Sequence, residues 1–177
     1  YVYRYLLDDF LSDIGGGHNI VSTVFLECEA FYRTSGAEAM KPVGEVEFIN
    51  GMAAMSASGL YGPTKVAAAI VGFADLRLGA AVDVVLKAQL AAGGGRFRGI
   101  RHASAHDPDP GIVGAENTNP NGNVLSDKKF REGFAQLAPL NLSFDSWLYH
   151  PQIPQLADLA NSFPDTAIVL DHVGGPL

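Results

Sequence analysis

The sequence predicts an α/β protein with a parallel sheet or a (β/α) barrel, and two observations support this prediction. Short apolar runs rich in β-branched and aromatic residues recur along the chain, and a stretch of helical character separates each run from the next. Strict alternation of strand and helix is typical of parallel architectures. The pattern gives the order of the elements and leaves open whether the sheet closes. The expected strands cover residues of about 20–27, 69–73, 97–101, 142–147 and 167–171.

The helices are predicted from apolar residues spaced near 3.6 residues and from glycines after the last turn. Pro151 stands near the first turn of one helix, where proline is tolerated, and Ser126 or Asp127 can cap the start of another. The expected helices cover residues 2–13, 44–58, about 63–69, 80–92, 127–137 and 151–163. Residues 102–126 carry turn formers without a period, and a loop of that length is usually functional.

The 177 residues fit one domain, 1–177, long enough to bury a substantial core. A net charge of −7 and a pI near 5 argue against a nucleic-acid surface. No apolar run approaches the roughly 20 residues of a membrane span, and no signal peptide is visible. The one cysteine, Cys28, fits a reducing compartment. We therefore expect a cytoplasmic protein that acts on a small molecule.

Several common site motifs are missing from the sequence. The glycine runs at 15–17 and 93–95 follow helices, so they are expected to be helix caps rather than phosphate-binding loops. There is no nucleophile elbow, no paired-cysteine metal motif and no HExxH. Chemistry is therefore sought at the ends of the strands.

The first candidate is His172, which follows the apolar run AIVLD and precedes two glycines. Parallel barrels carry their chemistry at the carboxyl ends of the strands, which is where His172 is expected. The alternative is a structural histidine bonded to a neighbouring loop. Asp171 should alternate to the other face, where it would orient a neighbour or cap a turn.

The preceding strand offers a second histidine. His150 lies a few residues past this strand, directly before Pro151. An imidazole there can bind a metal or hydrogen-bond a substrate, or it can simply be the polar residue that opens a helix. Asp145 and Trp147 share this strand end, and Trp147 is expected to be a pocket wall or a core residue.

The segment RFRGIR supplies two candidate arginines. Arg98 and Arg101 are three positions apart, so alternation predicts that one points into the mouth of the sheet and the other outward. A guanidinium near the mouth can hold a carboxylate or a lactone carbonyl, and the alternative is an ordinary surface arginine. Glu27, at the end of the first strand, is either a substrate-binding residue or a satisfied polar group at the rim. His102 and His106 lie in the long loop and could reach the same mouth.

Longer phrases give a resemblance along essentially the whole chain: VFLECEAFYR, PVGEVEF, IVGFADL, GGRFRGIRHA, FDSWLYHPQIPQLADLANSFPDT and IVLDHVGGPL. Together they resemble the amidohydrolase-related (amidohydrolase 2) family of metal-dependent hydrolases with a TIM-barrel fold, which includes lactonases. The resemblance implies a (β/α)8 barrel. It also implies an enzyme that opens a lactone of a sugar acid or dicarboxylic acid by attack of water on a polarised carbonyl.

The resemblance also implies roles for individual residues. His172 is similar to the family's sixth-strand histidine, and Arg98 and Arg101 match a fourth-strand motif that holds substrate. His150 lies close to the position of a fifth-strand histidine. The resemblance implies that His172 and His150 act in catalysis and can bind Zn²⁺ or Mn²⁺, or that the enzyme works without a metal. Glu27 and Trp147 complete the expected substrate-binding residues.

The family's first-strand HxH pair and eighth-strand aspartate do not occur in these 177 residues. A complete barrel takes about 250 residues, so we expect a partial barrel that covers strands two to six. It would belong to a longer enzyme or pair with another copy as a homo-oligomer. Two alternatives to the lactonase stay open: a metal-dependent decarboxylase on the same scaffold, and a fragment that is catalytically incomplete.

Overall fold

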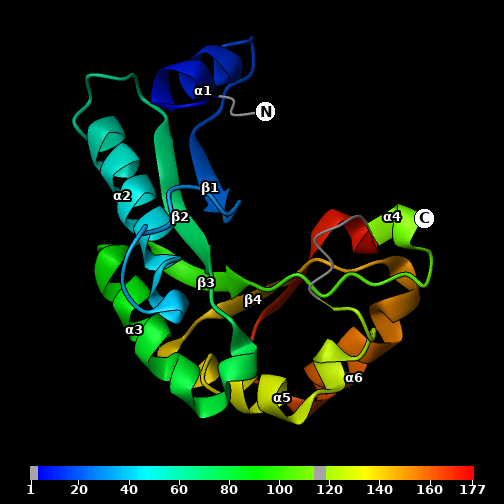
Figure 1. The fold of residues 1–177 in the computed structure, drawn as a ribbon. Coiled ribbons are helices and arrows are strands. Elements are labelled where there is room, and N and C mark those ends of the chain that lie inside the picture. The colour runs from blue at the N-terminus through cyan, green and yellow to red at the C-terminus, as the bar shows by residue number, and fades with distance from the viewer. Residues whose placement is uncertain (1–3, 114–118) are drawn as a thin grey trace.

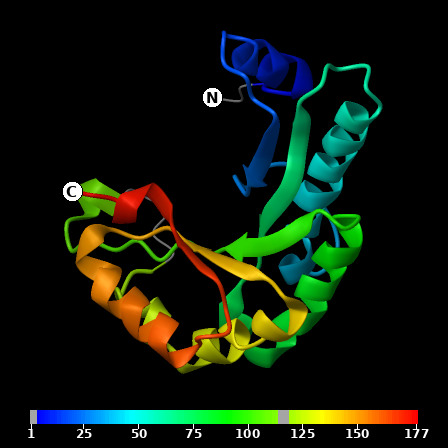
Figure 2. The same cartoon turned by 180° about the vertical axis from the view of Figure 1, so that it is seen from behind.

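A computed structural model describes residues 4–113 and 119–177, and it shows one curled parallel sheet (Figure 1). Neighbouring strands in the sequence are neighbours in the sheet, in the order β1-β2-β3-β4-β5, and every pair is parallel. The longer helices α2, α3 and α6, together with α5, lie on the convex side of the sheet (Figures 1 and 2). The prediction of an α/β, incomplete TIM barrel is therefore confirmed. The strands are β1 (Ser22–Leu26), β2 (Lys65–Phe73), β3 (Phe97–Arg101), β4 (Ser143–Ser146) and β5 (Ile168–Leu170).

The α-helices are α1 (Leu7–Ile14), α2 (Val43–Ala57), α3 (Val82–Ala92), α4 (Pro110–Val113), α5 (Lys128–Phe134) and α6 (Ile153–Ser162). Short 3-10 turns extend several of them, including η2 (Leu76–Ala81), η5 (His150–Gln152) and η6 (Asp171–Gly174). As predicted, Asp127 caps α5, because its carboxylate accepts a hydrogen bond from the main-chain N–H of Phe130 at 2.9 Å. Across the described ranges, no helix has the length and apolar character that a bilayer crossing requires.

The predicted helix at about 63–69 is wrong, because Lys65 already begins β2. The main-chain N–H of Lys65 donates to the carbonyl of Val21 at 3.0 Å, and Ala69 pairs with Val24 of β1. Alanine favours helices in isolation, but pairing with β1 and burial on the sheet override this weak preference.

The core lies between the sheet and the helices, and it combines aliphatic side chains with a group of packed phenylalanine rings. Phe144 of β4 packs edge-on against Phe134 of α5, with ring centroids 5.1 Å apart, and against Phe130 at 6.0 Å. Ile100 and Phe144 alternate with Arg101 and Asp145 along β3 and β4. The opposite, concave face of the strands is therefore the one that carries polar side chains.

Gly99 of β3 gives a test of this packing. A Cβ at Gly99 would lie 2.1 Å from Oγ of Ser143 and 2.7 Å from the Ser143 carbonyl. We expect Gly99→Ala to destabilise the protein by roughly 1–3 kcal/mol, since the crowding involves the backbone of β4. Gly51 lies in α2, where an added Cβ would meet no atom within 4 Å, so Gly51→Ala should stabilise by up to about 1 kcal/mol. Urea unfolding of both variants measures the difference, and equal midpoints would contradict the packing of β3 against β4.

Candidate functional site

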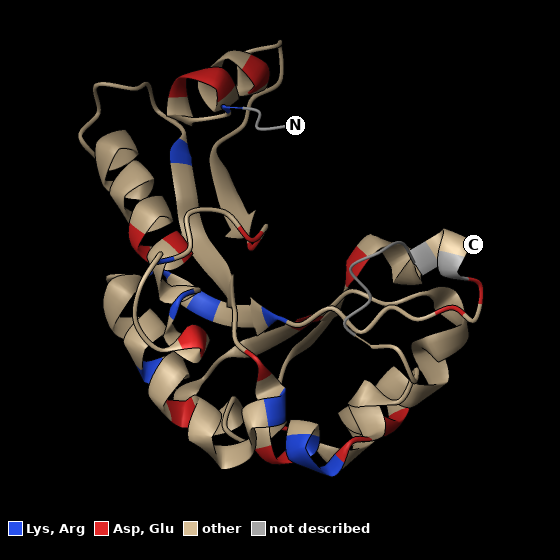
Figure 3. Cartoon of the chain, in the orientation of Figure 1, with Lys and Arg blue, Asp and Glu red and all other residues tan. Residues whose placement is uncertain are grey.

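Four charged residues gather at the carboxyl edge of the sheet. Glu27 follows β1, Arg101 ends β3, Asp145 lies on β4 and Asp171 follows β5. We refer to these four residues as the carboxyl-edge cluster. Acidic residues at the ends of β1 and β5 are visible in Figure 3. In α/β folds with parallel strands this edge is where ligands bind, so the cluster is the candidate active site.

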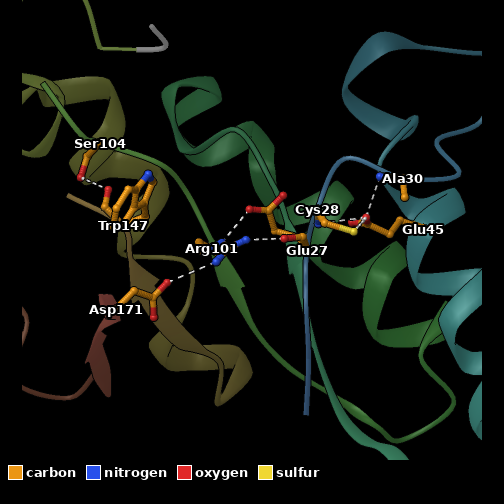
Figure 4. Close-up of polar contacts among 8 residues, drawn as sticks. All are labelled: Glu27, Cys28, Ala30, Glu45, Arg101, Ser104, Trp147 and Asp171. Atoms are coloured by element: carbon orange, nitrogen blue, oxygen red, sulfur yellow. Dashed lines mark hydrogen bonds and ion pairs between the residues drawn. The ribbon is translucent and has the colours of Figure 1, made fainter. Parts of the chain in front are cut away.

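Arg101 is the centre of the cluster (Figure 4). Its Nε donates to Oε1 of Glu27 at 2.7 Å, and its Nη2 donates to the main-chain carbonyl of the same residue. Nη1 lies 3.5 Å from Oδ2 of Asp171. One guanidinium therefore connects the ends of β1, β3 and β5, and all three side chains are largely buried.

Asp145 is paired in register with Arg101 on the neighbouring strand. Its side chain is buried, and Oδ1 accepts a hydrogen bond from Oγ of Ser143 at 3.4 Å. Burial, and then the negative charge of Asp171, raise the pKa of Asp145 to about 6, although Ser143 and Arg101 oppose this rise. Oδ2 of Asp171 is itself buried and accepts no hydrogen bond from the described residues. The cluster thus holds more carboxylates than its one guanidinium balances.

The structure brings His172 and Trp147 together beside the cluster. Their rings meet edge-on with centroids 4.8 Å apart. His172 is exposed and has a φ of +49°, because the strand ends at Leu170 and the chain turns through η6. The main-chain carbonyl of Trp147 accepts hydrogen bonds from the N–H of Ser104 at 2.8 Å and from Oγ of Ser104 at 3.3 Å, and Figure 4 shows the second of these. Two predicted site residues therefore form one wall at the ends of β4 and β5.

His150 lies next to the turn that follows β5. Its main-chain N–H donates to the carbonyl of Gly175, and its Nδ1 accepts a hydrogen bond from the main-chain N–H of Leu177, both at 3.3 Å. The side chain is exposed. His150 is thus near the segment that carries His172, but one of its ring nitrogens is already occupied.

Arg98 does not join the cluster. It is exposed, and its Nη1 donates to the carbonyl of Phe97 on its own strand at 2.9 Å. His102 is buried among Phe73 and Phe130, and its Nδ1 accepts from the N–H of Leu76 at 3.4 Å. Burial lowers the pKa of His102 to about 4, so this histidine is neutral and structural.

The beginning of the long loop is anchored to the segment after β4. Gln152 accepts a hydrogen bond from the main-chain N–H of His106 at 2.8 Å and donates to the carbonyl of Ser104 at 2.6 Å. His106 also contacts the carbonyl of Asn119 through Nδ1 at 3.1 Å. The loop of residues 102–126 was predicted to be functional, and its residues 114–118 lie outside the described residues.

A metal ion bound by His150 and His172 was one expectation from the sequence. Among the residues that the structure describes, no three His, Cys, Asp or Glu side chains are grouped so that they could hold a metal ion. Structural and catalytic zinc sites use at least three protein ligands. The donors within residues 4–113 and 119–177 do not form such a site by themselves, and we derive no chemical step through a metal.

Comparison with known proteins decides the family. A family model described as amidohydrolase matches residues 63–177, which include Arg101, Asp145 and Asp171. The chain belongs to the amidohydrolase family. The family resemblance predicted from the sequence is thus confirmed, and three of the four cluster residues lie within the matched part of this amidohydrolase-family chain.

One curated protein and one solved structure are similar to this chain. The uncharacterized protein y4mH of Sinorhizobium fredii (strain NBRC 101917 / NGR234) is 32% identical over 170 residues, which is 96% of this chain and 50% of the relative. The chain therefore spans about half the length of this curated relative. A crystal structure of an amidohydrolase from Burkholderia multivorans with bound HEPES matches with a TM-score of 0.46 and 19% identity, over 88% of this chain and 56% of that one.

Two cluster residues were not among the predicted site residues. Asp145 and Asp171 lie at the carboxyl ends of expected strands, as Arg101 does. This shared placement was the signal in the sequence that could have identified them as neighbours of Arg101. Asp171 was expected on the face opposite to His172, where it would orient a neighbour or cap a turn. In the structure it forms an ion pair with Arg101. Glu45 of α2 is fully buried and also contacts the loop after β1, yet nothing local in the sequence marks it.

Proposed function

We propose that this chain forms the substrate-holding part of an amidohydrolase-type enzyme that opens a lactone by attack of water on the ring carbonyl. The observation that carries the proposal is the buried guanidinium of Arg101 at the carboxyl edge, fixed by Glu27 and Asp171. Family membership supports the hydrolase class. The chemistry of the cluster supports the choice of a lactone.

Arg101 is suited to polarise a carbonyl. A guanidinium has five N–H donors. Two of them donate to Glu27, and Nη1 lies 3.5 Å from Oδ2 of Asp171. The remaining donors can bind the oxygen that becomes negative when water attacks the carbonyl carbon. Donors already fixed in position need no reorganisation at that moment, and one such donor is worth about 10²–10³ in kcat.

The charges around Arg101 favour a neutral substrate over an anionic one. Asp145 and Asp171 flank the guanidinium, and Glu27 is bonded to it, so the ionised cluster is net negative. A decarboxylase would have to hold a free carboxylate at this point, against the repulsion of these groups. A neutral sugar lactone presents a carbonyl and hydroxyl groups but no negative charge, so it fits better than a dicarboxylate lactone or a decarboxylase substrate.

The residues of this chain have divided roles in the proposal. Arg101 binds and polarises the carbonyl, and the wall of Trp147 and His172 borders the place where the sugar ring would lie. The resemblance assigns the water-activating base to an aspartate on a later strand of the barrel. Attack of water and cleavage of the ring C–O bond then release a hydroxy acid.

The test measures the hydrolysis of neutral aldonolactones through the acid that it releases. The assay uses both the 177-residue chain and the full-length polypeptide that its gene encodes. We expect turnover by the gene-encoded polypeptide, weaker turnover of dicarboxylate lactones, and no carbon dioxide release from aromatic acids. Carbon dioxide release without ring opening would favour the decarboxylase. Zn²⁺ and Mn²⁺ are added in parallel assays. If neither ion binds or raises turnover, the enzyme does not depend on these metals. Activity of the chain alone would contradict the view that it holds only part of the site.

A further inference from the structure

The loop that follows β1 rests on the first turn of α2, and Glu45 holds it there (Figure 4). Oε1 of Glu45 accepts hydrogen bonds from the main-chain N–H groups of Cys28 at 3.1 Å and Ala30 at 2.8 Å. The Cys28 thiol adds a contact at 3.6 Å, and burial and the Glu45 charge raise its pKa to about 11, so it stays protonated. Glu45 itself is fully buried.

The loop needs this support because its backbone is unfavourable. Glu29 and Phe31 have φ values of +59° and +55°, which L-residues other than glycine seldom adopt. Such conformations persist when the surroundings fix them. A Cβ on Gly44 would lie 2.6 Å from the carbonyl oxygen of Phe31, so the loop lies directly against the helix.

The hydrogen bond from Cys28 to Glu45 and the hydrogen bond from Arg101 to Glu27 involve the same peptide group. The N–H of Cys28 and the carbonyl of Glu27 belong to the same planar unit and point in opposite directions. Glu45 holds the N–H side, and Arg101 Nη2 donates to the carbonyl side. A rotation of this plane would therefore move the carbonyl away from the guanidinium.

We propose that Glu45 is a positioning residue, which fixes the guanidinium of Arg101 through the peptide group between Glu27 and Cys28. Glu45 is too deeply buried to act on a substrate directly. Its effect on turnover rests on the proposed function of Arg101, whereas its effect on the Arg101 side chain does not.

The experiment measures the Nε–H resonance of Arg101 by NMR. This resonance is assigned because it disappears in the Arg101→Lys variant. In Glu45→Ala, we expect this proton to exchange with water about tenfold faster, since the bonds that fix the loop are lost. Glu45→Gln keeps an acceptor oxygen and should restore slow exchange. If Glu45→Ala does not fold, Glu45→Asp serves instead, because its carboxylate is one methylene too short to reach both N–H groups.

Ser56→Ala is the matched control. Ser56 is a buried residue of the same helix that also makes two hydrogen bonds, to the carbonyl of Thr64 and from the N–H of Val66, but these lie at the start of β2. It should leave the Arg101 resonance unchanged. Equal effects of Ser56→Ala and Glu45→Ala, or no effect of Glu45→Ala or Glu45→Asp, would overturn the proposal.

Turnover provides the second readout. In the gene-encoded polypeptide, we expect kcat/KM for lactones to fall about tenfold in Glu45→Ala, with recovery in Glu45→Gln and no change in Ser56→Ala. The Arg101 resonance can respond as expected while neither the parent protein nor any variant hydrolyses a lactone. In that case the proposed function fails and the positioning role stands. If turnover falls while the resonance is unchanged, the positioning role fails.

Discussion

Arg101→Met is expected to destabilise the native state by about 3–5 kcal/mol and to reduce lactone turnover by about a hundredfold or more. The change removes the only guanidinium in the carboxyl-edge cluster and leaves Glu27 and Asp171 as buried carboxylates without their counter-charge. A buried charge that loses its partner cannot recover its hydration, so the effect should exceed that of an exposed ion pair. Urea unfolding at neutral pH measures the stability.

Arg98→Met is the control for stability. Arg98 lies on the same strand but is exposed and bonds only to the neighbouring carbonyl of Phe97 among the described residues. Its replacement should change the free energy of unfolding by no more than about 0.5 kcal/mol. If Arg101→Met unfolds at the urea concentration of the parent protein, Arg101 is not the electrostatic centre of the site.

Asp145→Asn should make the protein more stable at pH 8, by roughly 2–3 kcal/mol. The pKa of Asp145 is raised to about 6 in the folded state, against about 3.9 in the unfolded chain. The folded state therefore binds its proton at higher pH than the unfolded state does. Ionised Asp145 disfavours folding above about pH 6, and this penalty disappears as the pH falls towards the unfolded value.

The gain from Asp145→Asn should accordingly shrink to near zero by about pH 4. Asp165, an exposed residue in the turn before β5, provides the control for loss of one carboxylate. Asp165→Asn should alter stability by less than about 0.5 kcal/mol at both pH values. A less stable Asp145→Asn variant at pH 8 would mean that Arg101 stabilises the Asp145 carboxylate more than burial and Asp171 disfavour it.

Local patterns in the sequence were sufficient for the order of the strands. The observed β3 begins and ends at the predicted residues, Phe97 and Arg101. The start of β2 was missed because Ala67 and Ala68 have no local preference for a strand, and the pairing of this segment with β1 is a long-range contact.

The site was only partly predictable because it depends on where strands stop. Strict alternation was extended past Leu170, but η6 begins there and His172 adopts a positive φ. Asp171 consequently reaches Arg101, while His172 packs on Trp147. Glu45 was missed for another reason: its partners lie 15 and 17 residues earlier in the chain, and no helical or strand period connects them.

The most direct test is the position of a lactam, a neutral lactone analogue that water opens far more slowly, in a crystal structure of the full-length protein. We expect the lactam carbonyl oxygen to lie within hydrogen-bond distance of the Arg101 guanidinium at the carboxyl edge of β3. A lactam bound elsewhere, with Arg101 still held by Glu27 and Asp171 and contacting no ligand, would contradict the proposed role of Arg101.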